Sequence, residues 1–254
     1  MLHTVISGEP TDQPALLIAH GLYGSARNWG VIAKRLSESR QVVSVDMRNH
    51  GTSPRSHHNS YFDMADDLAE VITDLGDQMD VLGHSMGGKA AMVLALQHPD
   101  LVRRLVVADI APVAYGHTQI HLIDAMKHID LAKVQSRSDA DKQLAEQVDT
   151  ASVRAFLLQS LDVKERVWRL NLDALAANMH LITGFPDISG EFAHPTFFLS
   201  GKESDYVQAD HRPLIRSLFP AAHFAKIPGA GHWLHAEKPR EFELAVDAFL
   251  KAEI

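Results

Sequence analysis

Short unbroken runs of hydrophobic residues recur along the chain, separated by longer stretches with helical spacing. Runs of this kind, bounded by turn residues, are typical of parallel β-strands that are buried on both faces. They occupy residues 15–19, 41–46, 79–82, 103–109, 195–200 and 223–227. A weaker alternation over 2–7 predicts a short strand at the edge of the sheet.

Helical spacing fills most of the intervals between these runs. Segment 61–75, for example, carries Phe62, Ala65, Leu68 and Ile72 on one face of a helix. Comparable segments occupy 29–36, 89–98, 208–219 and 239–251. Strands that alternate with helices form crossover units. The sequence therefore predicts an α/β protein whose mostly parallel sheet is covered by helices on both faces.

This alternation stops between residues 115 and 186. The stretch has no convincing strand pattern, and its helix-prone segments lie at 120–134, 139–147, 152–161 and 164–179. We therefore expect an all-helical cap, residues 115–186, inserted into a core that consists of residues 1–114 and 187–254.

The run 79–82 leads into Gly83-His84-Ser85-Met86-Gly87, a G-x-S-x-G motif, and a strongly helix-forming stretch follows. Strand, sharp turn and helix are the context of a nucleophile elbow, in which the serine hydroxyl is exposed at the edge of a sheet. Glycine is needed because a Cβ would clash where the strand and helix approach each other. A Gly-Ser turn that only connects two elements is the alternative, and the flanking pattern favours Ser85 as a nucleophile.

A serine nucleophile needs a base, and the chain offers sixteen histidines. His232 lies in the glycine-rich loop Pro228-Gly-Ala-Gly-His-Trp233, directly after the last strand run. Loops at the carboxyl ends of parallel strands line a common site, so we expect His232 to face Ser85. His235 is three residues away, but no third ligand accompanies the two histidines, and we expect no metal.

Two carboxylates compete to orient this histidine and to stabilise its charged form. Asp109 ends the run 103–109, and Asp205 follows the run 195–200. Both come after strands, so the pattern alone leaves both open.

The negative charge that develops during acyl transfer needs hydrogen-bond donors. The backbone N–H of Met86, directly after Ser85, is one, and the loop after the first buried strand supplies the other. Within His20-Gly-Leu-Tyr-Gly24 we expect the Leu22 amide to take this role.

Composition excludes several classes of function. The chain has no cysteine, which removes disulfides, Cys-ligated zinc and a thiol nucleophile. Its formal net charge is −8, from 32 acidic and 24 basic residues without a basic block, which argues against nucleic-acid binding. We find neither a signal-peptide pattern nor an apolar run of membrane-spanning length, and we expect a cytoplasmic protein that does not bind membranes.

The chain resembles the α/β-hydrolase family along nearly its whole length, and within it the small bacterial esterases of the YbfF type. The motifs that carry the resemblance are H-G-L-Y-G-S, V-D-M-R-N-H-G-x-S-P, G-H-S-M-G-G-K-A, A-D-I-A-P-V-x-Y and A-G-A-G-H-W-x-H-A-E-K-P. The order serine, aspartate, histidine is also that of the family. Many members begin with two antiparallel strands, and the short stretch before Pro14 leads us to expect a truncated first edge.

The resemblance implies that the orienting acid is Asp109. Ser204 occupies the position where the wider family usually has its acid, so Asp205 is one residue out of register. We therefore favour Asp109 and keep Asp205 as the alternative.

These residues together predict a serine carboxylesterase that hydrolyses small or acyl-chain carboxylic esters through an acyl-enzyme, as a monomer or homodimer without a cofactor. An acyl-CoA thioesterase, a C–C bond hydrolase or a cofactor-free haloperoxidase would use the same triad. A non-catalytic hydrolase-fold protein that binds a ligand would be expected to lack one of these elements. The residues that we expect to line the substrate pocket are Tyr23, His84, Phe156, Trp168 and Trp233.

Overall fold

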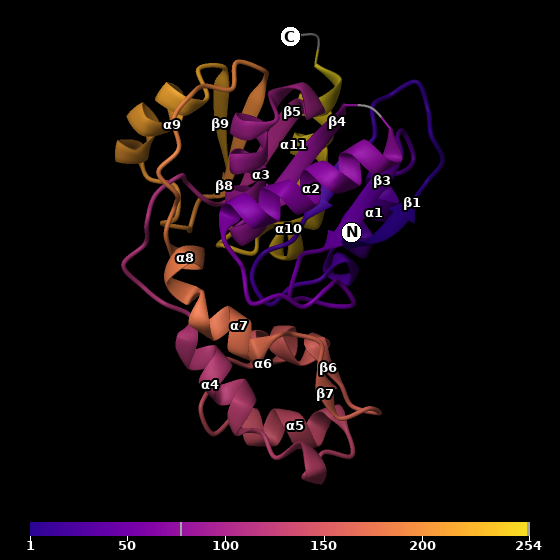
Figure 1. Cartoon of the computed structure of the whole chain (residues 1–254), viewed down its shortest axis with the longest axis vertical. Helices are drawn as coiled ribbons and strands as arrows, with labels where there is room; N and C mark the ends of the chain where they lie inside the picture. The colour runs from indigo at the N-terminus through magenta and orange to yellow at the C-terminus, as the bar shows by residue number, and fades with distance from the viewer. Residues whose placement is uncertain (77, 253–254) are drawn as a thin grey trace.

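A seven-stranded sheet forms the centre of the protein, with the strand order β1-β3-β2-β4-β5-β8-β9 (Figure 1). The computed structural model describes residues 1–76 and 78–252. The strands are β1 (His3–Ser7), β2 (Leu16–Ala19), β3 (Val42–Asp46), β4 (Met79–His84), β5 (Val102–Ala108), β8 (Thr196–Gly201) and β9 (Ala222–Ile227). Each predicted strand run forms a strand, and all neighbouring pairs except β1–β3 are parallel. The predicted α/β architecture is confirmed.

The two faces of the sheet are covered by different helices. The helices of the core are α1 (Gly30–Leu36), α2 (Tyr61–Leu75), α3 (Met86–Gln97), α9 (Arg212–Leu218), α10 (Leu234–Glu237) and α11 (Pro239–Lys251). Successive side chains of a strand point to opposite faces. On β2, Leu16 and Ile18 accordingly pack with α1 and α11, whereas Leu17 and Ala19 pack with α2 and α3. The inner strands are buried on both faces, which explains why they read as nearly unbroken apolar runs.

The first edge of the sheet holds one antiparallel strand. β1 pairs with β3 in the register His3 to Asp46 through Ser7 to Val42. The expectation of a short first edge strand over residues 2–7 is therefore confirmed.

A long segment between β5 and β8 contributes no strand to this sheet and gathers beside one end of it (Figure 1). Its helices and strands are α4 (Ile120–His128), α5 (Arg137–Leu144), α6 (Ala151–Leu157), β6 (Leu161–Asp162), β7 (Val167–Trp168), α7 (Leu172–Ala177) and α8 (Met179–Thr183). We call residues 115–186 the inserted segment. It begins and ends beside α3, at Tyr115 and Thr183, whose backbones are joined by a 3.0 Å hydrogen bond.

The expectation that the inserted segment is all-helical is wrong over residues 161–171. β6 and β7 form a small antiparallel hairpin where a helix was predicted to begin at residue 164. The Asp162 carboxylate accepts the Glu165 amide at 3.0 Å and pairs with Arg169, which closes the hairpin. The helix starts only at Leu172, after Asn171 caps its first turn. Aspartate and asparagine compete with helices in this way through local bonds to the backbone.

A buried ion cluster joins the strands at the other end of the sheet from the Ser85 turn. Asp80 on β4 accepts from Arg40 at 2.7 Å and from Arg103 at 2.8 and 2.7 Å. The side chains of Asp80 and Arg40 are fully buried. Removing one member of a buried pair leaves the other charge without compensation.

We predict that Asp80→Asn lowers the free energy of unfolding by roughly 3–5 kcal/mol, because Arg40 would remain buried beside a neutral amide. Urea denaturation followed by far-UV circular dichroism measures this. Asp162→Asn is the matched control: its pair with Arg169 lies at the surface, and its loss should stay below about 1 kcal/mol. Equal small losses for both variants would contradict the assignment.

Candidate active site

Ser85 lies at a sharp turn between β4 and α3. Its φ of 53° and ψ of −118° are unusual for a residue with a side chain and store strain of order 1–3 kcal/mol. The packing around the turn leaves no room for a side chain at either of the two glycines of the motif. A Cβ at Gly83 would lie 2.2 Å from the Gly87 oxygen, and one at Gly87 would lie 2.3 Å from the Ala19 oxygen. Glycine is therefore required at both positions, as the motif predicts.

Three side chains from distant parts of the sequence form a line at this turn. Ser85 Oγ lies 3.1 Å from Nε2 of His232, and Nδ1 of the same ring lies 2.8 Å from Oδ2 of Asp109. A carboxylate only accepts hydrogen bonds, so His232 carries its proton on Nδ1 and turns its bare Nε2 toward the serine hydroxyl. This is the arrangement in which a histidine can take the proton of a serine.

Asp109, and not Asp205, contacts His232. Asp109 directly follows β5 and is fully buried; its carboxylate also accepts the Gly201 amide at 3.0 Å and the Ser204 hydroxyl. The side chain of Asp205 is exposed, and among the described residues it has no contact with His232. Ser204 occupies the position of the usual family acid and donates a hydrogen bond to the Asp109 carboxylate, which follows β5.

The Leu22 amide is free in the loop after β2. The neighbouring Tyr23 N–H is already used, because it donates to Nε2 of His50 at 3.1 Å. Within the described chain the N–H groups of Leu22 and Met86 have no acceptor, and both residues line the same cavity as Ser85. Met86 is also the first residue of α3, where unpaired amides and the helix dipole favour negative charge.

A cavity of ≈ 540 Å³ lies over Ser85, between the ends of the strands and the inserted segment. Of the residues expected to line it, Tyr23, His84, Phe156 and Trp233 do so. Trp168 does not, which corrects that expectation. It is buried within the inserted segment, where its Nε1–H donates to the Met126 carbonyl at 3.1 Å. The apolar residues of the lining include Leu22, Ile110, Leu122, Val153, Phe156 and Ile182.

Two residues that contact the site were not predicted from the sequence. The ring of Tyr206 stacks on His232 with centroids 4.0 Å apart, and so limits how the imidazole can turn. Lys89, one turn after Ser85 on α3, donates to the carbonyls of Thr183 and Gly184 at the end of the inserted segment. Lys89 could have been noticed as a lysine in an otherwise apolar helix. No sequence pattern pointed to Tyr206.

Burial lowers the pKa of Lys89 to about 7, and no carboxylate pairs with it among the described residues. The ring centroids of Tyr115 and Tyr61 lie 4.7 and 5.7 Å from its Nζ, so the amino group contacts both aromatic rings.

Two further histidines pack behind His232. His84 donates from Nε2 to the His232 carbonyl at 2.9 Å, and its ring contacts that of His235. His235 in turn stacks on Trp29 with centroids 4.3 Å apart. Burial, reinforced by the neighbouring histidines, lowers the pKa of His235 to about 3 and that of His84 well below its ordinary value. Both are therefore neutral near pH 7.

In the part of the chain that the structure describes, no group of three metal-ligating side chains could hold a metal ion. The same residues include no helix that is long and apolar enough to cross a membrane. The absence of a cofactor, the cytoplasmic location and the oligomeric state stay predictions.

The parallel sheet with its serine, histidine and aspartate at the strand ends is the arrangement of serine hydrolases. Residues 14–239 match the family described as "alpha/beta hydrolase fold", and the chain belongs to this family.

Several similar proteins are named as lipases or esterases. The chain is 45% identical to the mouse sn-1-specific diacylglycerol lipase ABHD11, over 98% of this chain and 84% of the relative. It is 37% identical to esterase YbfF of Escherichia coli, over 92% of each protein. The solved structure of a marine microorganism esterase superposes with a TM-score of 0.92 at 39% identity and covers 98% of both chains. The chain is therefore an enzyme, a hydrolase of the ester-cleaving type.

We predict that the stability of the protein falls as the pH is lowered below about 6.5, because histidines take up protons in the unfolded state but not in the buried sites. His235 contributes to this loss until the pH reaches its folded pKa of about 3. His235→Phe keeps a ring on Trp29 and removes one such group. The slope of the unfolding free energy between pH 6.5 and 5 should then decrease by up to about 1.4 kcal/mol per pH unit. Urea titrations at several pH values measure it, and an unchanged slope would contradict a neutral His235.

Proposed function

We propose that the chain hydrolyses carboxylic esters through an acyl-enzyme formed on Ser85. The observation that supports this most directly is the continuous line Ser85 Oγ, His232 and Asp109, with separations of 3.1 and 2.8 Å, at the floor of a cavity. A hydrolase-fold protein kept only for ligand binding has no need of this geometry.

In the first half of the reaction Ser85 Oγ attacks the ester carbonyl carbon, and its proton passes to Nε2 of His232. Asp109 stabilises the imidazolium from the opposite side of the ring. The carbonyl oxygen becomes an oxyanion, which the amides of Leu22 and Met86 bind. When the intermediate collapses, the bond to the alcohol breaks, and the departing oxygen takes the proton from His232.

In the second half a water molecule replaces the alcohol. His232 accepts a proton from the water, whose oxygen forms the new bond to the acyl carbon. Collapse of this second intermediate returns the proton to Ser85 Oγ and releases the carboxylic acid. Every proton is accounted for by one imidazole, so the chemistry needs no further group.

We also propose that residues 115–186 act as a cap that forms the binding site for the acyl or alcohol part of the ester. Leu122, Val153, Phe156 and Ile182 of this segment line the cavity, together with Leu22 of the core. This lining favours an apolar acyl chain over a charged one. The mouse relative is named for the hydrolysis of diacylglycerol, an ester of this description.

A Ser85→Ala variant tests the function. It should reduce hydrolysis of p-nitrophenyl esters by more than about 10⁴-fold, because the nucleophile is lost while the chain still folds. Ser217→Ala, an exposed serine on α9, is the matched control and should retain full activity. Retention of a tenth of the activity by Ser85→Ala would refute the proposal, and esters of graded chain length would show the acyl preference.

The two candidate acids are compared through variants that keep the shape and remove the charge. Asp109→Asn should lower kcat by up to about 10⁴-fold, since the amide favours the wrong tautomer of His232. Asp205→Asn should change kcat only a few-fold, because a solvent-exposed charge is screened. Circular dichroism and melting temperature establish that both variants fold. A crippled Asp205→Asn beside an active Asp109→Asn would reverse the assignment.

A further inference from the structure

Two loops at neighbouring strand ends each carry a buried histidine. His20 follows β2, and His50 lies in the loop after β3; the two rings meet edge to face with centroids 5.0 Å apart. Each ring accepts a backbone N–H from the loop that carries the other histidine. Nε2 of His50 accepts the Tyr23 amide at 3.1 Å, and Nε2 of His20 accepts the Met47 amide at 2.9 Å. The two loops are therefore joined by a reciprocal pair of bonds, which we call the histidine brace.

The remaining ring nitrogens fix the protonation of the brace. Nδ1 of His20 lies 2.7 Å from the Gly21 carbonyl, and Nδ1 of His50 lies 2.8 Å from the Arg48 carbonyl. A carbonyl only accepts, so both Nδ1 atoms carry protons and both Nε2 atoms are bare acceptors. Burial lowers the pKa of His20 to about 4 and that of His50 to about 3. Both acceptors persist throughout the neutral pH range.

The loop that His50 holds is the one that supplies the Leu22 amide. Tyr23, the next residue, has a φ of 64°, a conformation that side chains other than glycine rarely adopt. Its amide is bound by His50, and its carbonyl accepts the hydroxyl of Ser160 at 3.0 Å. A strained residue keeps its conformation only where its surroundings determine it. The direction of the Leu22 N–H therefore depends on the bond from Tyr23 to His50.

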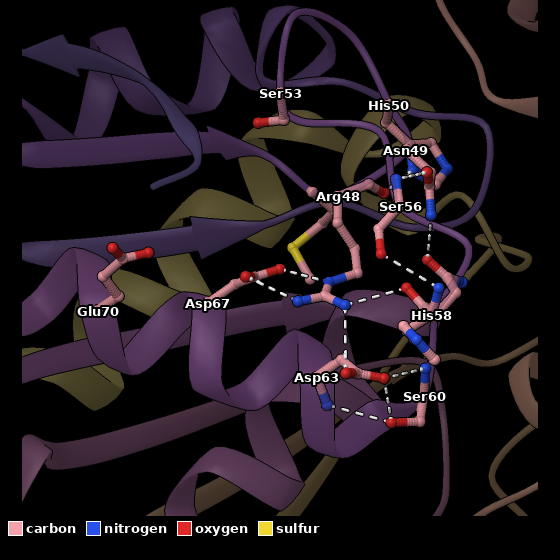
Figure 2. A network of polar contacts seen from close by, with 12 residues as sticks. Arg48, Asn49, His50, Ser53, Ser56, His58, Ser60, Asp63, Asp67 and Glu70 are labelled. Carbon is pink, nitrogen blue, oxygen red and sulfur yellow. Dashed lines mark hydrogen bonds and ion pairs between the residues drawn. The ribbon is translucent and has the colours of Figure 1, made fainter.

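The loop after β3 is in turn fixed to α2. Figure 2 shows the Arg48 guanidinium between Asp67 and Asp63, with bonds of 2.6 and 2.9 Å to Asp67 and a separation of 3.4 Å from Asp63. The next residue, Asn49, donates to Asn59 at 2.8 Å and has a φ of 66°. The backbone that carries His50 is thus held by the ion pairs of Arg48 with α2 and by the hydrogen bond of Asn49 to Asn59.

Asn49 also connects this loop to the inserted segment. Its backbone carbonyl and side-chain oxygen accept from Asn171, each at 2.9 Å. The same short loop therefore contacts the oxyanion loop on one side and the segment above the cavity on the other.

We propose that His50 is a positioning residue for the oxyanion hole: its neutral imidazole holds the Tyr23 amide and thereby aims the Leu22 N–H at the substrate oxygen. The assignment rests on the ester hydrolysis proposed above. His50 does not touch substrate. Its contribution appears when charge develops on the carbonyl oxygen, and it leaves the binding of the uncharged ester largely unchanged.

His50→Leu and His50→Gln provide the test. Leucine fills the space without an acceptor, whereas the glutamine carbonyl can reach the Tyr23 amide. Losing one oxyanion donor costs about 10²–10³-fold, so we expect His50→Leu to lower kcat about 10²-fold while KM stays within about threefold. The inhibition constant of an alkyl trifluoromethyl ketone, which forms a tetrahedral oxyanion on serine, should rise in proportion. His50→Gln should recover about tenfold of each loss.

Val71→Ala, a buried change on α2 away from both loops, controls for destabilisation. It should lower the melting temperature without changing kcat or the ketone constant. Asp67→Asn changes the contact between α2 and Arg48 and leaves His50 in place. It therefore gives an independent measurement even if His50→Leu fails to fold. By loosening Arg48 it should lower kcat a few-fold and weaken the ketone to the same extent. Unchanged ketone binding in His50→Leu, or in Asp67→Asn where His50→Leu fails to fold, would overturn the proposal, as would losses that follow melting temperature alone.

Fluorophosphonate labelling separates this outcome from failure of the proposed function. If the probe labels Ser85 of the unaltered protein and this protein hydrolyses esters, the proposed function stands whatever the histidine variants do. If it is not labelled, the function itself fails. The expected result is labelling in the unaltered protein and slower labelling in His50→Leu.

Discussion

The close approach of α3 to β2 and β4 is the constraint on which the site depends. Gly87 lies so near the Ala19 carbonyl that a Cβ would come within 2.3 Å of it. This contact forces the chain through the unusual conformation at Ser85 and puts the first amide of α3 beside the serine hydroxyl. It also brings the loop after β2 against the same point, since Gly21 in that loop packs on His84 and Ser85. Ser85 and the two amides that we propose for the oxyanion hole thus share a single packing interaction. The parallel sheet is rigid enough to hold it because it is buried on both faces.

Burial has a second effect, which is to sort the histidines by protonation state. The pKa values of His20, His50 and His235 fall to about 4, 3 and 3, chiefly because a buried imidazolium lacks hydration. These rings serve as fixed acceptors and packing groups. His232 differs in its surroundings, because it faces the cavity and has the Asp109 carboxylate at 2.8 Å. The buried rings are fixed acceptors and packing groups, whereas His232 is the ring that we propose as the base.

Much of this could be predicted from the sequence because the relevant signals are local. Apolar runs identified the strands, and glycine spacing predicted the elbow. Strand-end position left both Asp109 and Asp205 open as the acid, and the family resemblance favoured Asp109. What local patterns could not give were contacts between distant segments. Trp168 is turned into the inserted segment and not toward the cavity, and Tyr206 stacks on His232 from the loop after β8. The hairpin at 161–168 was missed because helix-forming composition was outweighed by the bonds that Asp162 makes.

The proposed reaction requires that ester cleavage pass through a covalent bond to Ser85. Rapid quenching after mixing with p-nitrophenyl butyrate, followed by intact-mass and peptide mass spectrometry, tests it directly. We predict a transient mass increase of one butyryl group, located on the peptide that contains Ser85 and absent from Ser85→Ala. Low temperature slows the attack of water on the acyl-enzyme and should make the adduct easier to trap. Full ester turnover with no acyl adduct on Ser85, or with the adduct on another residue, would contradict the account.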